Sequence, residues 1–312
     1  MKFHEFTIKH LNKIQSNKIQ VNSEIKPFLI NFNNIETITI KKNNINNLIK
    51  SKFLPNEIYK EISKYQNTYS TQMDNLLLFF YADNNYNIKR QIKFIKYFNG
   101  INQFFKSLTK KPFDKLIKIS IYFSPFKKFI KEEIISPINI NSGFTYNNNI
   151  IIFREEEWKK VLIHELIHVY GIDNYQFEVI PFINGLDMKY EALTEYIALI
   201  IHSQLISFIS KTNFKTIIID EIIFNIIQSN KILNHWKINK WNDFKKKKII
   251  VKSSPFSYFI FKTELLINYS KHKYLLEQFI LPEVNLTNLS NLLLIPYNLN
   301  DNNLRMTLYD II

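Results

Sequence analysis

The chain has 312 residues and no cysteine, which excludes disulfide bonds, thiol nucleophiles and thiolate metal ligands. Glycine is also scarce, and neither a glycine-rich phosphate loop nor a GxSxG nucleophile motif occurs. No apolar run reaches the roughly 18 residues of a membrane-spanning helix, and the N-terminus lacks the pattern of a signal peptide. We therefore expect a cytoplasmic, intracellular protein without a membrane partner, in which any metal is held by imidazoles and carboxylates.

Arginine is nearly absent, because 38 of the 41 basic residues behind the net charge of +14 are lysines. Proteins that recognise phosphates and bases usually use the bidentate fork of arginine. The abundance of Asn, Ile, Lys, Phe and Tyr is the bias of an A+T-rich coding sequence, which supplies lysine whether or not a phosphate is bound. We therefore do not favour a nucleic-acid partner, although a basic surface could steer acidic substrates.

The apolar patterns predict an α+β fold. Residues 117–123 alternate strictly and predict a strand that ends at Ser124-Pro125, and residues 28–40 are also strand-like. Residues 89–108 have apolar side chains at helical spacing, which Gly100 interrupts.

Helices dominate the predictions for the second half of the chain. A loop with the sequence NSGFTYNNN leads into a short strand that ends at Arg154, and three glutamates then open a helix. This helix runs through WKKVLIHELIHVY and stops at Gly171, a residue suited to a helix C-terminus. Further helices are predicted at residues 188–210, 217–228 and 256–269.

The helix that runs through WKKVLIHELIHVY carries an HExxH motif, formed by His164, Glu165 and His168. Residues four apart lie on one face of a helix, about 6 Å apart along its axis. Two imidazoles in this arrangement can occupy adjacent corners of a zinc tetrahedron. Glu165 would lie beside them as the general base for a metal-activated water.

A catalytic zinc site needs a third protein ligand and an open fourth position. Glu191 and Glu195 are four residues apart on the next predicted helix, which is largely apolar. Two carboxylates on one such face are costly to bury unless a cation neutralises them. One of them could bind the metal, and the other could orient a ligating imidazole.

HELIH followed by EALTEY resembles the gluzincin branch of the zincin metallopeptidases over residues 149–210. The resemblance implies a zincin-like fold and a peptidase activity, with Glu191 as the third ligand and Glu195 as the acidic residue that orients a histidine. It also implies that the strand at residues 150–153 binds the substrate backbone by edge pairing. The stretch NSGFTYNNNIIIFREEEWKKVLIHELIH is similar to uncharacterised HExxH proteins of large DNA viruses, so virion association is a further expectation.

An alternative to the gluzincin pattern begins at the same histidines. The segment up to Gly171 also fits the start of the metzincin pattern HExxHxxGxxH, but its third ligand would fall on Asn174, with Asp173 one place away. Met188 could represent a Met-turn, but it directly precedes the segment of Glu191. We prefer the gluzincin interpretation because it needs no shifted ligand.

A residue that stabilises the oxyanion completes the predicted site. Zincins commonly use a tyrosine or histidine for this purpose, and Tyr258 in SSPFSYFIFK is the preferred candidate, with His202 and His235 as alternatives.

The sequence thus predicts an N-terminal α/β region of unknown role at residues 1–110 and a zincin-like metallopeptidase domain at residues 111–312. The predicted function is hydrolysis of protein or peptide substrates with one Zn²⁺ per chain. A catalytically inactive zincin-like binding protein and a basic nucleic-acid-associated protein are the alternatives.

Overall fold

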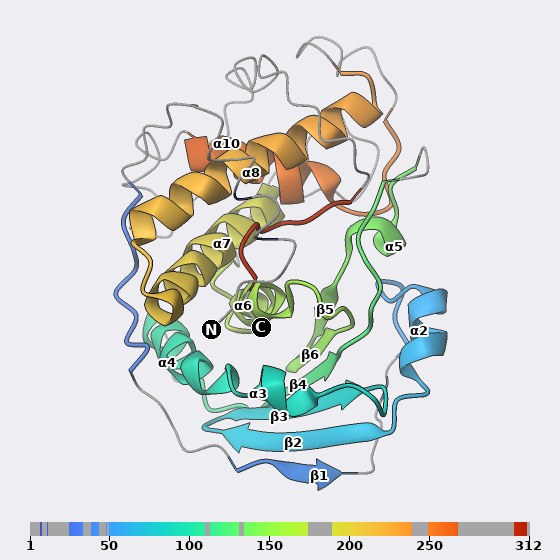
Figure 1. Cartoon of the computed structure of the whole chain (residues 1–312), viewed down its shortest axis with the longest axis vertical. Helices are drawn as coiled ribbons and strands as arrows, with labels where there is room; N and C mark the ends of the chain where they lie inside the picture. The colour runs from blue at the N-terminus through green and yellow to red at the C-terminus, as the bar shows by residue number, and fades with distance from the viewer. Residues whose placement is uncertain are drawn as a thin grey trace. The chain divides into compact units, whose positions relative to one another are not determined.

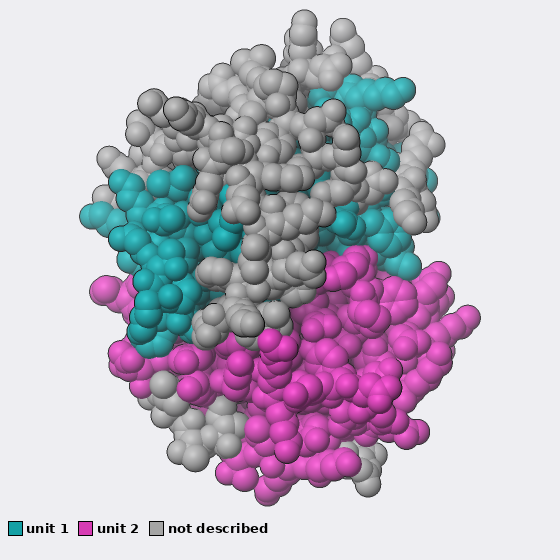
Figure 2. Space-filling model, viewed as in Figure 1, with its two compact units in different colours: residues 1–27, 128–140, 175–311 teal, residues 28–127, 141–174, 312 magenta. Residues whose placement is uncertain are grey.

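The computed structural model describes residues 7, 11, 25–33, 39–43, 48, 50–109, 113–130, 134–173, 189–238, 249–267 and 303–310. Its architecture is α+β with a six-stranded mixed sheet, which confirms the predicted fold class. The chain divides into two compact units, coloured separately in Figure 2. The sheet unit comprises Phe28–Lys127, Asn141–Asn174 and Ile312, and the helical unit comprises Met1–Pro27, Lys128–Ile140 and Tyr175–Ile311.

The sheet has the strand order β1-β2-β3-β4-β6-β5 (Figure 1). Its centre is parallel, since β4 pairs in parallel with both β3 and β6, while the outer pairings are antiparallel. The strands are β1 (Lys41–Asn43), β2 (Asn67–Met73), β3 (Leu76–Ala82), β4 (Ile117–Tyr122), β5 (Gly143–Tyr146) and β6 (Asn149–Ile152).

Strands β4 and β6 confirm two predicted strands, but two other predictions for this unit were wrong. Within the strand-like range 28–40, the described residues 28–33 and 39–40 form no strand, and β1 begins only at Lys41. The sequence NSGFTYNNN was predicted to be a loop, whereas its centre forms β5. A two-residue turn joins β5 to β6, with Asn147 in the left-handed region at a φ of 53°.

The predicted helix at residues 89–108 consists of three pieces, α3 (Ile88–Ile92), the 3₁₀ turn η1 (Ile95–Tyr97) and α4 (Phe98–Leu108). The break therefore does not fall at Gly100, which lies inside α4. A Cβ atom on Gly100 would lie 2.2 Å from the backbone oxygen of Asn31. The glycine thus permits close packing against another segment rather than interrupting the helix.

Two further helices belong to the sheet unit, α2 (Asn56–Ile62) and α6 (Trp158–Val169). Helix α6 packs on β5, β6 and α4, and it is seen nearly end-on in Figure 1. The buried rings of Tyr81 and Tyr122 stack at 4.3 Å between centroids in a separate apolar cluster that includes Phe153. Burial of these aromatic side chains stabilises the sheet that supports α6.

The helical unit contains α5 (Pro137–Ile140), α7 (Lys189–Ser210), α8 (Phe214–His235), the π-helix η2 (Phe256–Phe261) and α10 (Lys262–Ile267). These elements confirm the helices predicted after residue 188. Among the described residues, α7 alone is long and apolar enough to cross a membrane by length and composition. However, 83% of its most apolar stretch is buried inside the protein, as in the core helix of a soluble protein.

Candidate metal centre

The two histidines of the HExxH motif converge on one point beside α6. Their Nε2 atoms lie 2.9 Å apart, and the rings meet edge to face with their centroids 4.6 Å apart. His164 is buried and His168 is half-buried. Two nitrogens bound tetrahedrally to one zinc ion, each at 2.0–2.1 Å, would be about 3.3 Å apart. The imidazole pair therefore fits adjacent corners of a zinc site with little adjustment.

Asp173 contacts His168 from the side opposite to this point. Its carboxylate pairs with Nδ1 of the ring, and Asp173 itself is buried. The helix terminus makes this contact possible, because Gly171 adopts a φ of 63° and the amide of Ile172 donates to the oxygen of Ile167 at 3.1 Å. This Schellman turn reverses the chain and returns Asp173 to the helix. A proton held on Nδ1 leaves the lone pair of Nε2 available to a metal ion.

Glu165 lies against β5 rather than in solvent. The hydroxyl of Thr145 donates a hydrogen bond of 2.8 Å to its Oε2 atom. A Cβ atom on Gly143, two residues earlier in the same strand, would lie 3.1 Å from Oε1 of the same carboxylate. Thr145 therefore orients the predicted base, and Gly143 leaves room for it.

Sequence reasoning missed Thr145 and Gly143 because it assigned their segment to a loop. One signal was available, since two asparagines between GFTY and NIII suit a two-residue hairpin turn. In such a hairpin Gly143 and Thr145 share one face of β5, because side chains alternate along a strand.

The strand expected to bind substrate needs a correction. We expected residues 150–153 to bind the substrate backbone through an unpaired strand edge. However, β6 is paired with β4 on one side and with β5 on the other. Strand β5 is the terminal strand next to α6. Any edge pairing at this end of the sheet would therefore use β5.

The predicted carboxylates lie on α7, in the helical unit. Glu191 is half-buried in the first turn, and Glu195 is buried one turn later. An oxygen of Glu195 lies 3.7 Å from Nζ of Lys262. Glu191 belongs to the helical unit, whereas His164 and His168 belong to the sheet unit. Coordination of one metal ion by all three residues therefore stays a prediction.

The oxyanion candidates are also found in the helical unit. Tyr258 is half-buried in η2, and π-helices often occur at functional sites. His202 is buried in α7 with Nδ1 3.4 Å from the hydroxyl of Thr307, and His235 ends α8 with its ring against Trp236. The role of Tyr258 stays a prediction. Two residues of the metzincin alternative, Asn174 and Met188, lie outside the described residues.

No protein-family model, curated protein or solved structure matches this chain. The resemblance to gluzincins therefore depends on the two motifs alone.

Proposed function

We propose that the protein is a zinc-dependent peptidase with a zincin-like fold, in which His164, His168 and Glu191 bind one zinc ion. The observation that carries this proposal is the convergence of two imidazole nitrogens at 2.9 Å beside a buried glutamate on the same helix. Two further contacts support it. Asp173 fixes the proton of His168 on Nδ1, and Thr145 orients Glu165.

Glu191 is the proposed third ligand because it belongs to the EALTEY segment and lies at the start of the helix that follows the HExxH helix. Asp173 is less suited to this role, since its carboxylate is already directed at Nδ1 of His168. One carboxylate and two neutral imidazoles would leave a bound zinc ion able to take water or substrate as a further ligand.

A zinc ion held by these residues would supply Lewis-acid chemistry to a substrate carbonyl and to water. Glu165 then performs the proton transfers. Its carboxylate accepts a proton from the attacking water and delivers it to the departing amine nitrogen. The hydrogen bond from Thr145 uses one lone pair of Oε2 of Glu165. It therefore holds the carboxylate in one orientation while the proton is transferred.

A peptide is the proposed substrate on the strength of the gluzincin resemblance. The terminal strand β5 is consistent with it, since an extended peptide could pair with a strand edge beside the catalytic helix. In that arrangement the substrate backbone would pass next to Thr145, whose side chain contacts the base.

The decisive experiment compares zinc content and peptide hydrolysis in the same preparations. We expect about one zinc per chain in the wild type and little in H164A or H168A. Glu165→Gln should retain zinc but lose hydrolysis of a fluorogenic peptide library by at least about 100-fold, since it removes the general base. Glu57→Gln, on α2, is the matched control and should retain both.

Two outcomes would refute the proposal. Full hydrolysis by Glu165→Gln would contradict the assigned base. A wild-type chain that binds zinc but cleaves no peptide, and that retains its cellular effect as Glu165→Gln, would favour the inactive binding protein.

A further inference from the structure

Lys262 is a fully buried cation at the first position of α10. Its Nζ atom donates a hydrogen bond of 2.9 Å to the backbone oxygen of Met306 and lies 3.7 Å from a carboxylate oxygen of Glu195. It therefore connects three parts of the helical unit, namely α10, α7 and the segment 303–310. A buried ammonium group needs such partners, because its desolvation is otherwise prohibitive.

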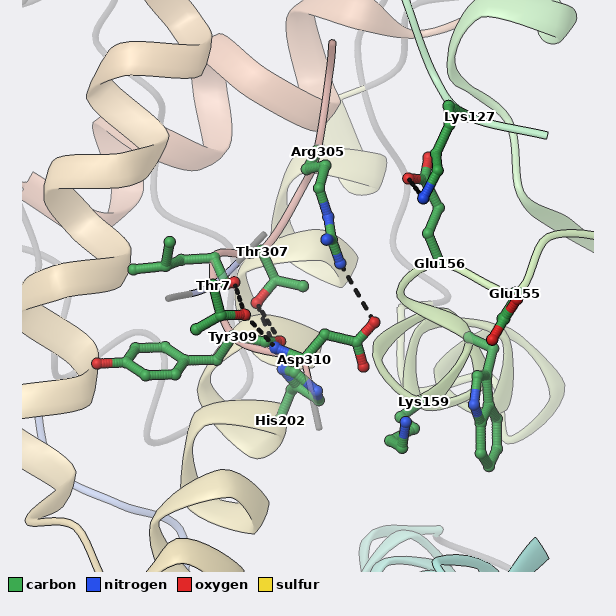
Figure 3. Close-up of polar contacts among 12 residues, drawn as sticks. Thr7, Lys127, Glu155, Glu156, Lys159, His202, Arg305, Thr307, Tyr309 and Asp310 are labelled. Atoms are coloured by element: carbon green, nitrogen blue, oxygen red, sulfur yellow. Dashed lines mark hydrogen bonds and ion pairs between the residues drawn. The ribbon is translucent and has the colours of Figure 1, made fainter. Parts of the chain in front are cut away.

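The segment 303–310, whose Met306 oxygen accepts the hydrogen bond from Lys262, is itself bound to α8 by hydrogen bonds. Glu221 on α8 accepts hydrogen bonds from the backbone amides of Leu308 and Tyr309 at 2.9 to 3.1 Å, and also from the hydroxyl of Thr307. Arg305 and Asp310 form an ion pair of 3.3 Å within the segment, which Figure 3 shows together with Thr307 and Tyr309. The carbonyl that orients Lys262 thus has a fixed position.

The other partner of Lys262 lies next to the proposed zinc ligand. Glu195 follows Glu191 by four residues, so the two carboxylates occupy the same face of α7, one turn apart. Without a nearby cation they would repel each other, and the buried Glu195 would be uncompensated. Lys262 offsets the charge of Glu195 from within the same unit and connects this turn of α7 to the segment 303–310.

We propose that Lys262 is a positioning residue for the zinc ligand Glu191, which it holds in place through Glu195. This inference rests on the proposed zinc site. Hydrogen-bond partners of metal ligands typically change metal affinity by about 10- to 100-fold when removed, and we expect an effect of this size from an ion pair one turn away from the ligand.

A double-mutant cycle with zinc affinity as its readout tests the inference. Chelator competition should show that Lys262→Met and Glu195→Gln each weaken zinc binding about 10- to 100-fold, and that the double variant binds as weakly as Glu195→Gln. The melting temperature should change differently. Both variants that lack Lys262 also remove its charge from Glu221, but only Lys262→Met keeps the buried carboxylate of Glu195 without the lysine, so the double variant should melt at a higher temperature than Lys262→Met. Lys262→Arg should rescue zinc affinity.

A purely structural role for Lys262 predicts another pattern, in which zinc affinity follows the melting temperature and the double variant binds more tightly than Lys262→Met. That pattern, or unchanged affinity in Lys262→Met, would overturn the inference. Tyr309→Phe is the matched control, because it removes from the same segment the hydroxyl that donates a hydrogen bond of 2.6 Å to Asp220 on α8. It should lower the melting temperature without changing zinc affinity.

The visible spectrum of the Co²⁺-substituted protein provides a second readout that does not depend on hydrolysis. It should change in Lys262→Met and remain like that of the wild type in Tyr309→Phe. A wild type that takes up neither zinc nor cobalt would refute the proposed function itself. A wild type with one metal ion and an unchanged Lys262→Met spectrum would refute only the role of Lys262.

Discussion

Asp173 determines which nitrogen of His168 is available for coordination. Its buried carboxylate pairs with Nδ1, so the Nε2 atom that faces His164 keeps its lone pair. Metal-binding histidines commonly have such a partner, which fixes both the tautomer and the plane of the ring. A single residue outside the HExxH motif therefore completes half of the candidate site.

Replacing this carboxylate should weaken the metal site without removing it. We expect Asp173→Ala to bind zinc about 10- to 100-fold more weakly than the wild type, because the ring of His168 loses its fixed orientation. Chelator competition measures the difference. Asp83→Ala, in an exposed turn, is the control and should bind zinc normally. Equal affinity in Asp173→Ala and the wild type would show that Asp173 does not tune the ligand.

At the scale of elements, the close approach of β5 to α6 places the base. A Cβ atom on Gly143 would meet Cγ1 of Val161 at 2.9 Å, the oxygen of Ile151 at 3.0 Å and Oε1 of Glu165 at 3.1 Å. The backbone oxygen belongs to β6 and the two side-chain atoms belong to α6, so a larger residue on β5 would press against both neighbours.

Gly143→Ala should therefore reduce both stability and activity. Overpacking of this kind typically costs about 1–3 kcal/mol, and displacement of Glu165 should lower the rate of hydrolysis per bound zinc. Urea unfolding and initial rates on zinc-loaded protein measure the two effects. Tyr146→Ala, on the same strand at a position that is 62% exposed, is the control. A fully active Gly143→Ala would contradict the tight approach.

The sequence predicted β4, α7 and the end of α6 well. It was wrong about the start of α6, because the glutamates at residues 155–157 precede the helix, which begins at Trp158 after Glu157 at a φ of 62°. Helix α6 stops at a glycine with positive φ, and β4 alternates strictly. Strand β3 was not predicted, since LLLFFYA is a continuous apolar run that suits a helix and a strand equally. Within the site, His164, Glu165 and His168 could be found from their spacing. The contacts of Thr145 and Lys262 could not, because they join segments far apart in the chain.

At the scale of the whole molecule, one buried carboxylate should make stability depend on pH. Burial raises the pKa of Glu221 from 4.5 to about 7, although its hydrogen bonds from Thr307, Leu308 and Tyr309 and the charge of Lys262 oppose the shift. The folded protein therefore binds this proton more tightly than the unfolded chain does. The resulting stabilisation is complete below about pH 4.5 and is lost as the pH rises to about 7.

The wild type should accordingly lose stability on the order of 3 kcal/mol from this group between about pH 4.5 and pH 7. Glu221→Gln cannot titrate and should lack this component. Urea unfolding of both proteins across that range gives the difference directly. A difference between them that does not change with pH would show that Glu221 has an ordinary pKa in the folded state.

The sheet contains strands from both sides of residue 110, where the sequence suggested a boundary between two domains. Strand β3 pairs with β4 from Leu76 opposite Ile117 to Tyr81 opposite Tyr122, so residues before and after position 110 belong to one hydrogen-bonded ladder. A shortened chain that began at residue 111 would present the backbone of β4 as an open edge, and open edges recruit strands from other molecules. Recombinant fragments that begin there should aggregate, and a usable minimal fragment has to include β2 and β3.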